Sequence, residues 1–288
     1  MGNWAKKMQG RAGLMLAGVL GGWSFAGQAM ANADLMGQPT PGAIDFQPAA
    51  TEVKQDIADF HNFVLVIITV ITLFVLALLI WVVVRYNRRA NPTPKTFTHN
   101  VAVEVLWTVI PVFILVAIAW KSFPLLYEEE RVPPAELTIK AIGNSWNWQY
   151  EYPDNGAVQV YSNMLPEDQA RAEGRPALLA VDNPIYVPVD TVVRIQVTSN
   201  DVIHSWAMPA FGVKEDAIPG RINEGWFNVN QEGIFYGQCS ELCGKNHAYM
   251  PIEVRAVSRA EFNRWIESQG GTAIQASAAA TPAAAPAR

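Results

Sequence analysis

Two long apolar segments dominate the hydrophobic pattern of the chain. The first covers residues 62–84 and contains no charged residue. A helix of that length, at about 1.5 Å per residue, spans roughly 35 Å and can cross the hydrocarbon core of a bilayer. The second covers residues 105–127, and its one charge, Lys121, lies near a helix end, where a long side chain can reach the headgroups. A soluble chain of this size could hardly bury helices so apolar on every face. The pattern predicts a transmembrane hairpin over residues 61–127, with spans at about 62–85 and 104–126.

The connector between the two spans is basic. It carries Arg85, Arg88, Arg89 and Lys95, and no acid precedes Glu104. Because basic connectors stay on the cytoplasmic side, both flanks of the hairpin are predicted to lie outside the cytoplasm.

The N-terminus has the pattern of an export signal. Cations at positions 6, 7 and 11 precede a glycine-rich apolar run at 14–27, and small residues surround position 31. Because the run is short, a cleaved signal peptide at 1–31 is favoured over an uncleaved anchor. The mature chain would begin near Asn32 or Asp34, and residues 32–60 would form an extracytoplasmic segment, in agreement with the predicted topology.

From residue 128 the apolar runs become short. Stretches such as "ELTIKAIG", "TVVRIQVTS" and "MPIEVRAV" are separated by turn formers. This spacing predicts an all-β Greek-key sandwich or small barrel over residues 128–270. Phe262, Trp265 and Ile266 are spaced to pack on one side of a short closing helix. The Ala/Pro-rich tail, 271–288, has low complexity and is predicted to be disordered.

Charge is uneven along the chain. The formal net charge is −5, but residues 128–267 alone contain 20 acids and 11 Lys and Arg, a net of −9. This balance excludes nucleic acid as a partner and would steer a basic protein toward the domain. Ordinary solubility charge explains it equally well.

The only two cysteines, Cys239 and Cys243, lie in the stretch "GQCSELCGKNHAYM". In an exported domain a disulfide is the first expectation. The neighbours His247 and Met250, together with the distant His204, point instead to a soft metal. Structural zinc sites use cysteine, histidine or carboxylate ligands and do not need a thioether, whereas copper electron-transfer sites combine imidazole, thiolate and methionine. Because two thiolates can bridge two ions, the second cysteine suggests a dinuclear copper centre that relays electrons.

Three motifs extend this reading: the cysteine loop, "DVIHSWAMPAFGVKEDAIPGR" and "GNSWNWQYEY". Together with the two helices they resemble subunit II of the haem-copper cytochrome c oxidases, from about Gln47 to Trp265. The resemblance implies a cupredoxin fold that holds the dinuclear CuA centre. It implies these ligands: the side chains of His204, Cys239, Cys243, His247 and Met250, and the backbone carbonyl of Glu241.

The resemblance also suggests roles beyond the copper ligands. The carboxylate of Glu241 would reach a Mg²⁺ or Mn²⁺ ion at the boundary with subunit I, whereas spacing alone favours a side chain that simply faces solvent. Trp146 would be where an electron enters from cytochrome c, although composition alone favours a core aromatic stripe. The acids Glu151, Asp182 and Asp201, called the docking acids below, would help to bind a lysine-rich cytochrome.

Glu104 begins the second span. A carboxylate there is favourable for helix-dipole reasons alone. The resemblance places it at the mouth of a proton channel, on the cytoplasmic side that the basic connector indicates.

The resemblance therefore implies the electron-input subunit of a cytochrome c oxidase in a bacterial inner membrane, and the predicted topology puts the β domain on the periplasmic side. The expected partners are haem-bearing subunit I, subunit III and cytochrome c, and the complex would reduce O₂ to water while pumping protons. A quinol oxidase subunit would lack the copper ligands, and a nitrous-oxide-reducing enzyme would lack the two-helix anchor. The remaining alternative is a membrane-tethered copper-binding or delivery module without an electron-transfer role.

Overall fold

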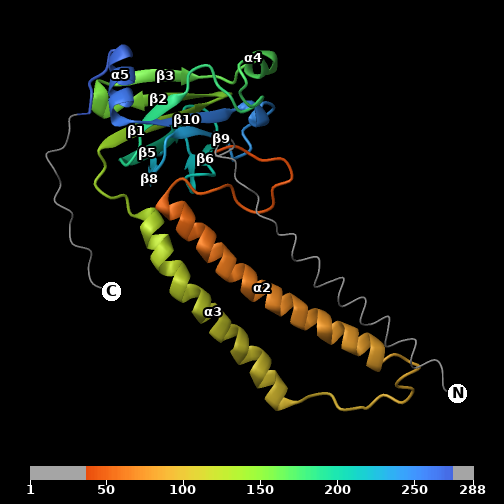
Figure 1. Cartoon of the computed structure of the whole chain (residues 1–288). Helices are drawn as coiled ribbons and strands as arrows, with labels where there is room; N and C mark the ends of the chain where they lie inside the picture. Colours follow the sequence, from red (N-terminus) through yellow and green to blue (C-terminus); the bar gives the residue numbers. More distant parts are fainter. Residues whose placement is uncertain (1–36, 275–288) are drawn as a thin grey trace.

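The structure, a computed structural model, describes residues 37–274. The predicted signal peptide at 1–31, the five positions after it, and residues 275–288 of the predicted tail lie outside the described residues. The described chain consists of two long helices and a β-rich domain at one end of the helix pair (Figure 1).

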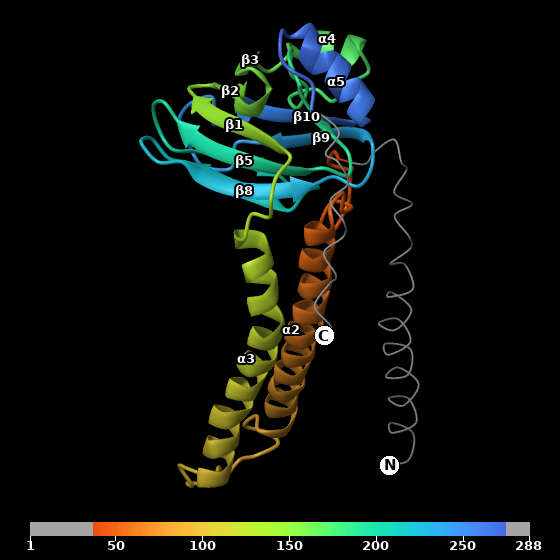
Figure 2. The ribbon, with the colours of Figure 1, turned by 90° about the vertical axis from the view of Figure 1, so that its left-hand side faces the viewer.

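The two helices contain the long apolar segments. Helix α2 spans Glu52–Arg85 and helix α3 spans Val101–Glu130, and by length and composition both could cross a membrane. They lie side by side in two perpendicular views (Figure 1, Figure 2). Most of their apolar side chains are exposed, because the rest of the described chain does not cover them. Such surfaces suit contact with lipid or with a partner subunit.

Helix α2 begins earlier than the predicted span at 62, and its first turn is attached to the β domain. Thr51 is the N-cap: its Oγ1 accepts a hydrogen bond from the Lys54 amide at 3.0 Å and donates to the carbonyl of Phe211 at 2.8 Å. Near the end of α3, Trp226 Nε1 donates to the carbonyl of Glu128 at 3.0 Å. Hydrogen bonds therefore join the start of α2 and the last turn of α3 to the β domain.

The β domain contains three sheets. Their strand orders are β3-β2-β1-β5-β8, β4-β10-β9 and β6-β7. Strands β1 and β5 pair in parallel, as do β4 and β10, and the other pairs are antiparallel. The strands are β1 Leu137–Asn144, β2 Asn147–Tyr152, β3 Val158–Ser162, β4 Ile185–Pro188, β5 Val192–Ser199, β6 His204–Met208, β7 Val213–Ala217, β8 Asn223–Asn228, β9 Gly233–Gln238 and β10 Pro251–Val257. The short helices are α4 Glu167–Ala172 and α5 Arg259–Ser268.

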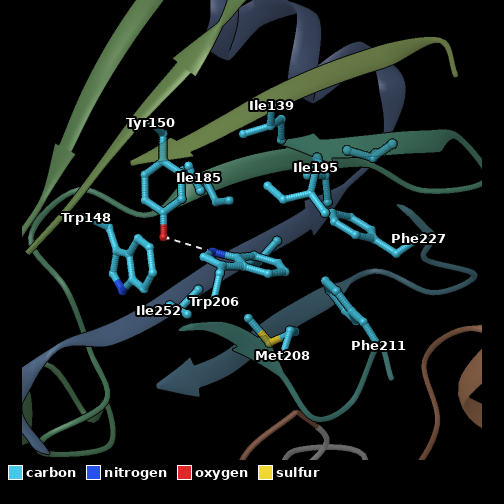
Figure 3. Packing of buried hydrophobic residues seen from close by; sticks show 14 of the residues in the cluster. Ile139, Trp148, Tyr150, Ile185, Ile195, Trp206, Met208, Phe211, Phe227 and Ile252 are labelled. Atoms are coloured by element: carbon cyan, nitrogen blue, oxygen red, sulfur yellow. Dashed lines mark hydrogen bonds between the residues drawn. The ribbon is translucent and has the colours of Figure 1, made fainter. Parts of the chain in front are cut away.

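Alternation of buried and half-buried side chains along β2 and β5 places one face of each strand in the core. The centre of this core is aromatic (Figure 3). Trp206 Nε1 donates to the Tyr150 hydroxyl at 3.3 Å, and Trp206 stacks on Phe227 with ring centroids 6.0 Å apart. These contacts satisfy the indole N–H while burying both large rings. The predicted all-β sandwich is confirmed.

The tail is ordered for longer than predicted. The Thr272 amide donates to the Asn155 carbonyl at 3.1 Å, and Asn155 Nδ2 donates back to the Thr272 carbonyl at 2.7 Å. The Ile274 amide donates to Asn263 Oδ1 at 3.0 Å. The prediction of disorder from 271 onward is therefore wrong for residues 271–274, because hydrogen bonds with Asn155 and Asn263 hold a segment that composition alone marks as low in complexity.

Candidate metal centre

The two cysteines lie on a closed loop between β9 and β10. We call residues 239–250 the ligand loop. The amide of Cys239 donates to the carbonyl of Met250 at 3.0 Å, which extends the β9–β10 ladder into the base of the loop. The ladder brings the two ends of the loop together, and a short 3₁₀ turn at His247–Tyr249 completes it. The sulfur atoms at both ends are buried.

A second strand brings the distant histidine to this loop. His204 is the first residue of β6, and its side chain is fully buried. The amide of Ser240 donates to the carbonyl of Ser205 at 3.0 Å, which ties the ligand loop to β6. As a result, the ligand atoms of His204, Cys239 and Cys243 lie within 4.8 Å of one another.

The two thiols are free and each has its own imidazole. The Sγ atoms of Cys239 and Cys243 are 3.8 Å apart, well beyond the length of about 2.05 Å for an S–S bond, so the disulfide expectation is wrong. His204 Nδ1 lies 4.0 Å from Cys239 Sγ, and His247 Nδ1 lies 3.6 Å from Cys243 Sγ. Each thiol therefore lies beside a different imidazole, and these four side chains together could hold a soft metal.

The other two predicted donors belong to the same ligand loop. Glu241 directs its carbonyl oxygen toward Cys239, whose Sγ donates to it at 3.3 Å, while its side chain is exposed. Met250 is buried at the end of the ligand loop. Two thiols, two imidazoles, a thioether and a carbonyl form a donor set that fits copper in its softness and number.

The two thiols differ in acidity. Burial alone would raise the pKa of Cys239, but hydrogen bonds from His204 and from the ligand-loop backbone outweigh it and lower the pKa to about 6. The pKa of Cys243 is raised to about 12, by burial and by the negative charge on Cys239. Only one thiolate therefore forms readily without a metal, and binding of a metal must release the proton of Cys243.

Asp201 holds the ring of His204. Its Oδ1 lies 2.8 Å from His204 Nε2 and also accepts from the amide of Val202 at 2.6 Å, while its Oδ2 accepts from the amide of Ser145 at 2.7 Å. Burial would raise the pKa of this carboxyl, but these hydrogen bonds hold it well below its ordinary value. A carboxylate can only accept, so Nε2 carries a proton, and Nδ1, which faces Cys239 Sγ, is the nitrogen that would bind a metal in place of its own proton.

Gly143 on β1 makes room for the same ring. A Cβ at this position would lie 2.7 Å from Cδ2 and 2.9 Å from Cγ of His204. Sequence reasoning missed both this clearance and the Asp201 contact. The sequence offered one signal for the Asp201 contact: Asp201 ends a Ser-Asn-Asp turn and lies three residues before the predicted ligand His204.

Trp146 lies apart from the core stripe. Trp148, Tyr150 and Tyr152 form the buried face of β2, as the core-stripe alternative predicts. Trp146 precedes the strand and is half-buried, and its Nε1 donates to the carbonyl of Cys243 at 3.2 Å. Its ring also lies against the ligand loop, since a Cβ on Gly244 would be 3.1 Å from Cζ2. The ring thus connects the surface to a predicted ligand.

The docking acids do not share one environment. Asp201 is brought to the ligands. Glu151 pairs with Lys140 at 3.2 Å, and Asp182 accepts from the backbone and side chain of Asn163 at 2.7 and 3.1 Å. Each of the three is already engaged within the domain.

Glu104 lies at the start of α3, at the end of the helix pair that is remote from the β domain (Figure 1). Its Oε1 accepts from the amide of Asn100 at 3.1 Å, while Asn100 Oδ1 accepts from the amide of Val103 at 3.3 Å. This is a reciprocal cap, the contact expected from the helix-end alternative.

Comparison with known proteins identifies the family. The model for the periplasmic domain of cytochrome c oxidase subunit II matches residues 137–257, and the model for its transmembrane domain matches residues 39–125. A probable cytochrome c oxidase subunit 2 of Rickettsia felis is 46% identical over 82% of this chain and 75% of its own length. Cytochrome c oxidase subunit 2 of Cereibacter sphaeroides is 42% identical over 89% of this chain and 90% of its own length.

Among solved structures, the periplasmic domain of subunit II of cytochrome oxidase of Bradyrhizobium japonicum is 55% identical. The match covers 49% of this chain and 97% of the solved chain, with a TM-score of 0.46. The two family models together match more than half of the sequence, and the relatives match over most of its length. The chain belongs to the cytochrome c oxidase subunit II family, with a cupredoxin-like β domain that follows two candidate membrane spans.

Proposed function

We propose that this chain is the subunit through which electrons enter a cytochrome c oxidase. It accepts electrons from cytochrome c and passes them to haem in subunit I, where O₂ is reduced to water and protons are pumped. The observation that carries the proposal is the pair of free thiols 3.8 Å apart, each beside its own imidazole. Membership of the subunit II family supports the same assignment.

Six donors would hold two copper ions: the side chains of His204, Cys239, Cys243, His247 and Met250, and the carbonyl of Glu241. When bound, such a pair supplies a one-electron store whose geometry changes little between redox states. The chain contributes a rigid frame, since the β9–β10 ladder closes the ligand loop and Asp201 fixes the ring of His204.

The burial of the donors argues against the copper-delivery alternative. His204 is 0% exposed, Met250 1%, Cys239 5% and Cys243 7%. A module that hands copper to another protein needs an accessible, incompletely filled site. Here the two thiols and the ring of His204 face one another inside the domain, which suits a resident metal.

Trp146 is the proposed point where the electron enters. The hydrogen bond from its Nε1 to the Cys243 carbonyl joins a half-exposed ring to the ligand loop. We retain Glu151 and Asp182 as docking acids for cytochrome c, although each is held by neighbours. Asp201 has a second and more direct role as the acceptor that orients His204.

The remaining assignments concern the rest of the complex. The exposed side chain of Glu241 would reach a Mg²⁺ or Mn²⁺ ion at the boundary with subunit I, and the exposed faces of α2 and α3 would pack on subunit I and subunit III. Glu104, beside the basic connector, would lie at the mouth of a proton channel. The β domain would lie on the periplasmic side of a bacterial inner membrane, after removal of the signal peptide.

A tryptophan variant of the assembled oxidase tests the proposal. Trp146→Phe should slow reduction by cytochrome c at least about tenfold while copper content stays the same, because the ring loses its N–H link to Cys243. Trp226→Phe is the matched control: its indole also donates to a carbonyl, but at the end of α3. Equal rates in both variants would refute the role of Trp146, and a complex that cytochrome c cannot reduce would refute the function.

A further inference from the structure

A lysine lies over the tryptophan at which electrons are proposed to enter. The Nζ of Lys245 is 5.7 Å from the centroid of the Trp146 ring, and the lysine is exposed. Both partners are positioned by the ligand loop. Lys245 lies in the loop between Cys243 and His247, and the ring donates to the carbonyl of Cys243.

The charge over this ring is opposite to that of the domain as a whole, in which acids exceed bases by nine between residues 128 and 267. Two of the docking acids have partners of their own within the domain. Glu151 already pairs with Lys140, and the carboxylate of Asp201 already accepts from two backbone amides and from His204. A donor lysine placed against the ring would therefore face the positive charge of Lys245.

The distance is short enough for the sign of this charge to matter. A donor group in contact with the Trp146 ring lies roughly 7 Å from the ammonium, which is just within one Debye length, about 8 Å at physiological ionic strength. At roughly 7 Å in water, one unit charge on the donor changes its affinity about threefold, in a direction set by its sign. The cation–π interaction between the Trp146 ring and the Lys245 ammonium is weak at an exposed site, so Lys245 can pair with a carboxylate of the donor.

We propose that Lys245 selects the electron donor, and that the natural donor places a carboxylate rather than a lysine against Trp146. The inference rests on the proposed electron-input function and adds a property of the partner. Lysines elsewhere on the donor can still be attracted by the acidic domain. At the ring itself the charges are reversed: the domain supplies the cation, Lys245, and the donor supplies the carboxylate.

The test uses the assembled oxidase and two donor probes: a lysine-rich cytochrome c, and the same cytochrome c with its lysines succinylated to carboxylates. Binding is measured as the Kd of the complex for each immobilised cytochrome at low ionic strength, and electron transfer by the second-order reduction rate. Lys245→Glu should bind the lysine-rich form about sevenfold more tightly at low ionic strength and the succinylated form about sevenfold more weakly. Lys245→Ser should give about threefold changes in the same directions.

Arg264→Glu is the matched control, because Arg264 is an exposed cation on α5, which packs against β4 rather than on the ligand loop. The opposite response of the two donors supports the proposal. It is overturned if Lys245→Glu affects both donors in the same direction, or affects neither more than Arg264→Glu does. If the wild-type complex is reduced by neither cytochrome, the proposed function fails and this inference fails with it.

Discussion

The hydrogen bond between Asp201 and His204 leads to the most specific prediction. Asp201→Ala removes the acceptor 2.8 Å from Nε2 of a ring that is 0% exposed. An unpaired buried N–H costs about 1–3 kcal/mol. The two backbone amides that also donate to Asp201 belong to exposed residues, so water can replace the carboxylate there. We expect the free energy of unfolding of the metal-free chain to fall by about 2 kcal/mol, and copper affinity to fall about 10- to 100-fold.

Thermal unfolding of the detergent-solubilised chain and copper competition with a chelator measure these two effects. Asp201→Asn should recover most of both, because an amide oxygen can accept the Nε2 proton. Asp154→Ala is the control: this exposed carboxylate accepts one backbone amide, that of Thr138 at 3.1 Å. Wild-type copper affinity and stability in Asp201→Ala, together with weaker binding of cytochrome c, would refute the orienting role and restore Asp201 as a docking acid only.

Three further predictions follow from contacts elsewhere in the chain. Burial, and then the negative charge of Glu130, raise the pKa of Glu215 to about 7, above its ordinary value of 4.5, so the folded chain holds this proton more tightly than the unfolded chain. Stability should therefore fall as pH rises from about 4.5 to 7, and Glu215→Gln should reduce that slope in thermal unfolding; an unchanged slope would contradict the assignment. Gly143→Ala should destabilise the domain by about 1–3 kcal/mol and weaken copper binding, because the new Cβ would lie 2.7 Å from the ring of His204; normal copper affinity would show that the ring can move without cost. Glu104→Gln keeps an oxygen for the helix cap but removes the charge, so it should slow turnover as much as Glu104→Ala if Glu104 serves proton uptake, and should leave turnover normal if it only caps α3.

The sequence was most informative where a pattern is local. An uncharged run of 23 residues at 62–84 has few stable alternatives to a membrane span, and α2 contains it. Alternation along β5 similarly predicts a strand with one buried face. The start of α2 at Glu52 was missed because polar residues carry its first turns, although Thr51 followed by an acid is a standard helix start.

The candidate site shows the same limit. Five of the six predicted copper ligands lie in one short stretch of sequence, residues 239–250, so their spacing and chemistry could be interpreted together. The contact from Asp201 depends on how the turn after β5 directs its carboxylate, and the clearance at Gly143 depends on a strand far from His204 in sequence. Neither can be read from spacing, because tertiary packing alone brings these groups together.

The copper content of the full-length chain tests the central claim most directly. The chain is purified in detergent, loaded with copper, dialysed and assayed for metal per polypeptide, beside a variant with Cys239→Ser and Cys243→Ser. Two free thiols 3.8 Å apart, each with its own imidazole, predict two copper ions per chain in the wild type and none retained by the double variant. One copper ion per chain, or zinc held in preference to copper, would contradict the account.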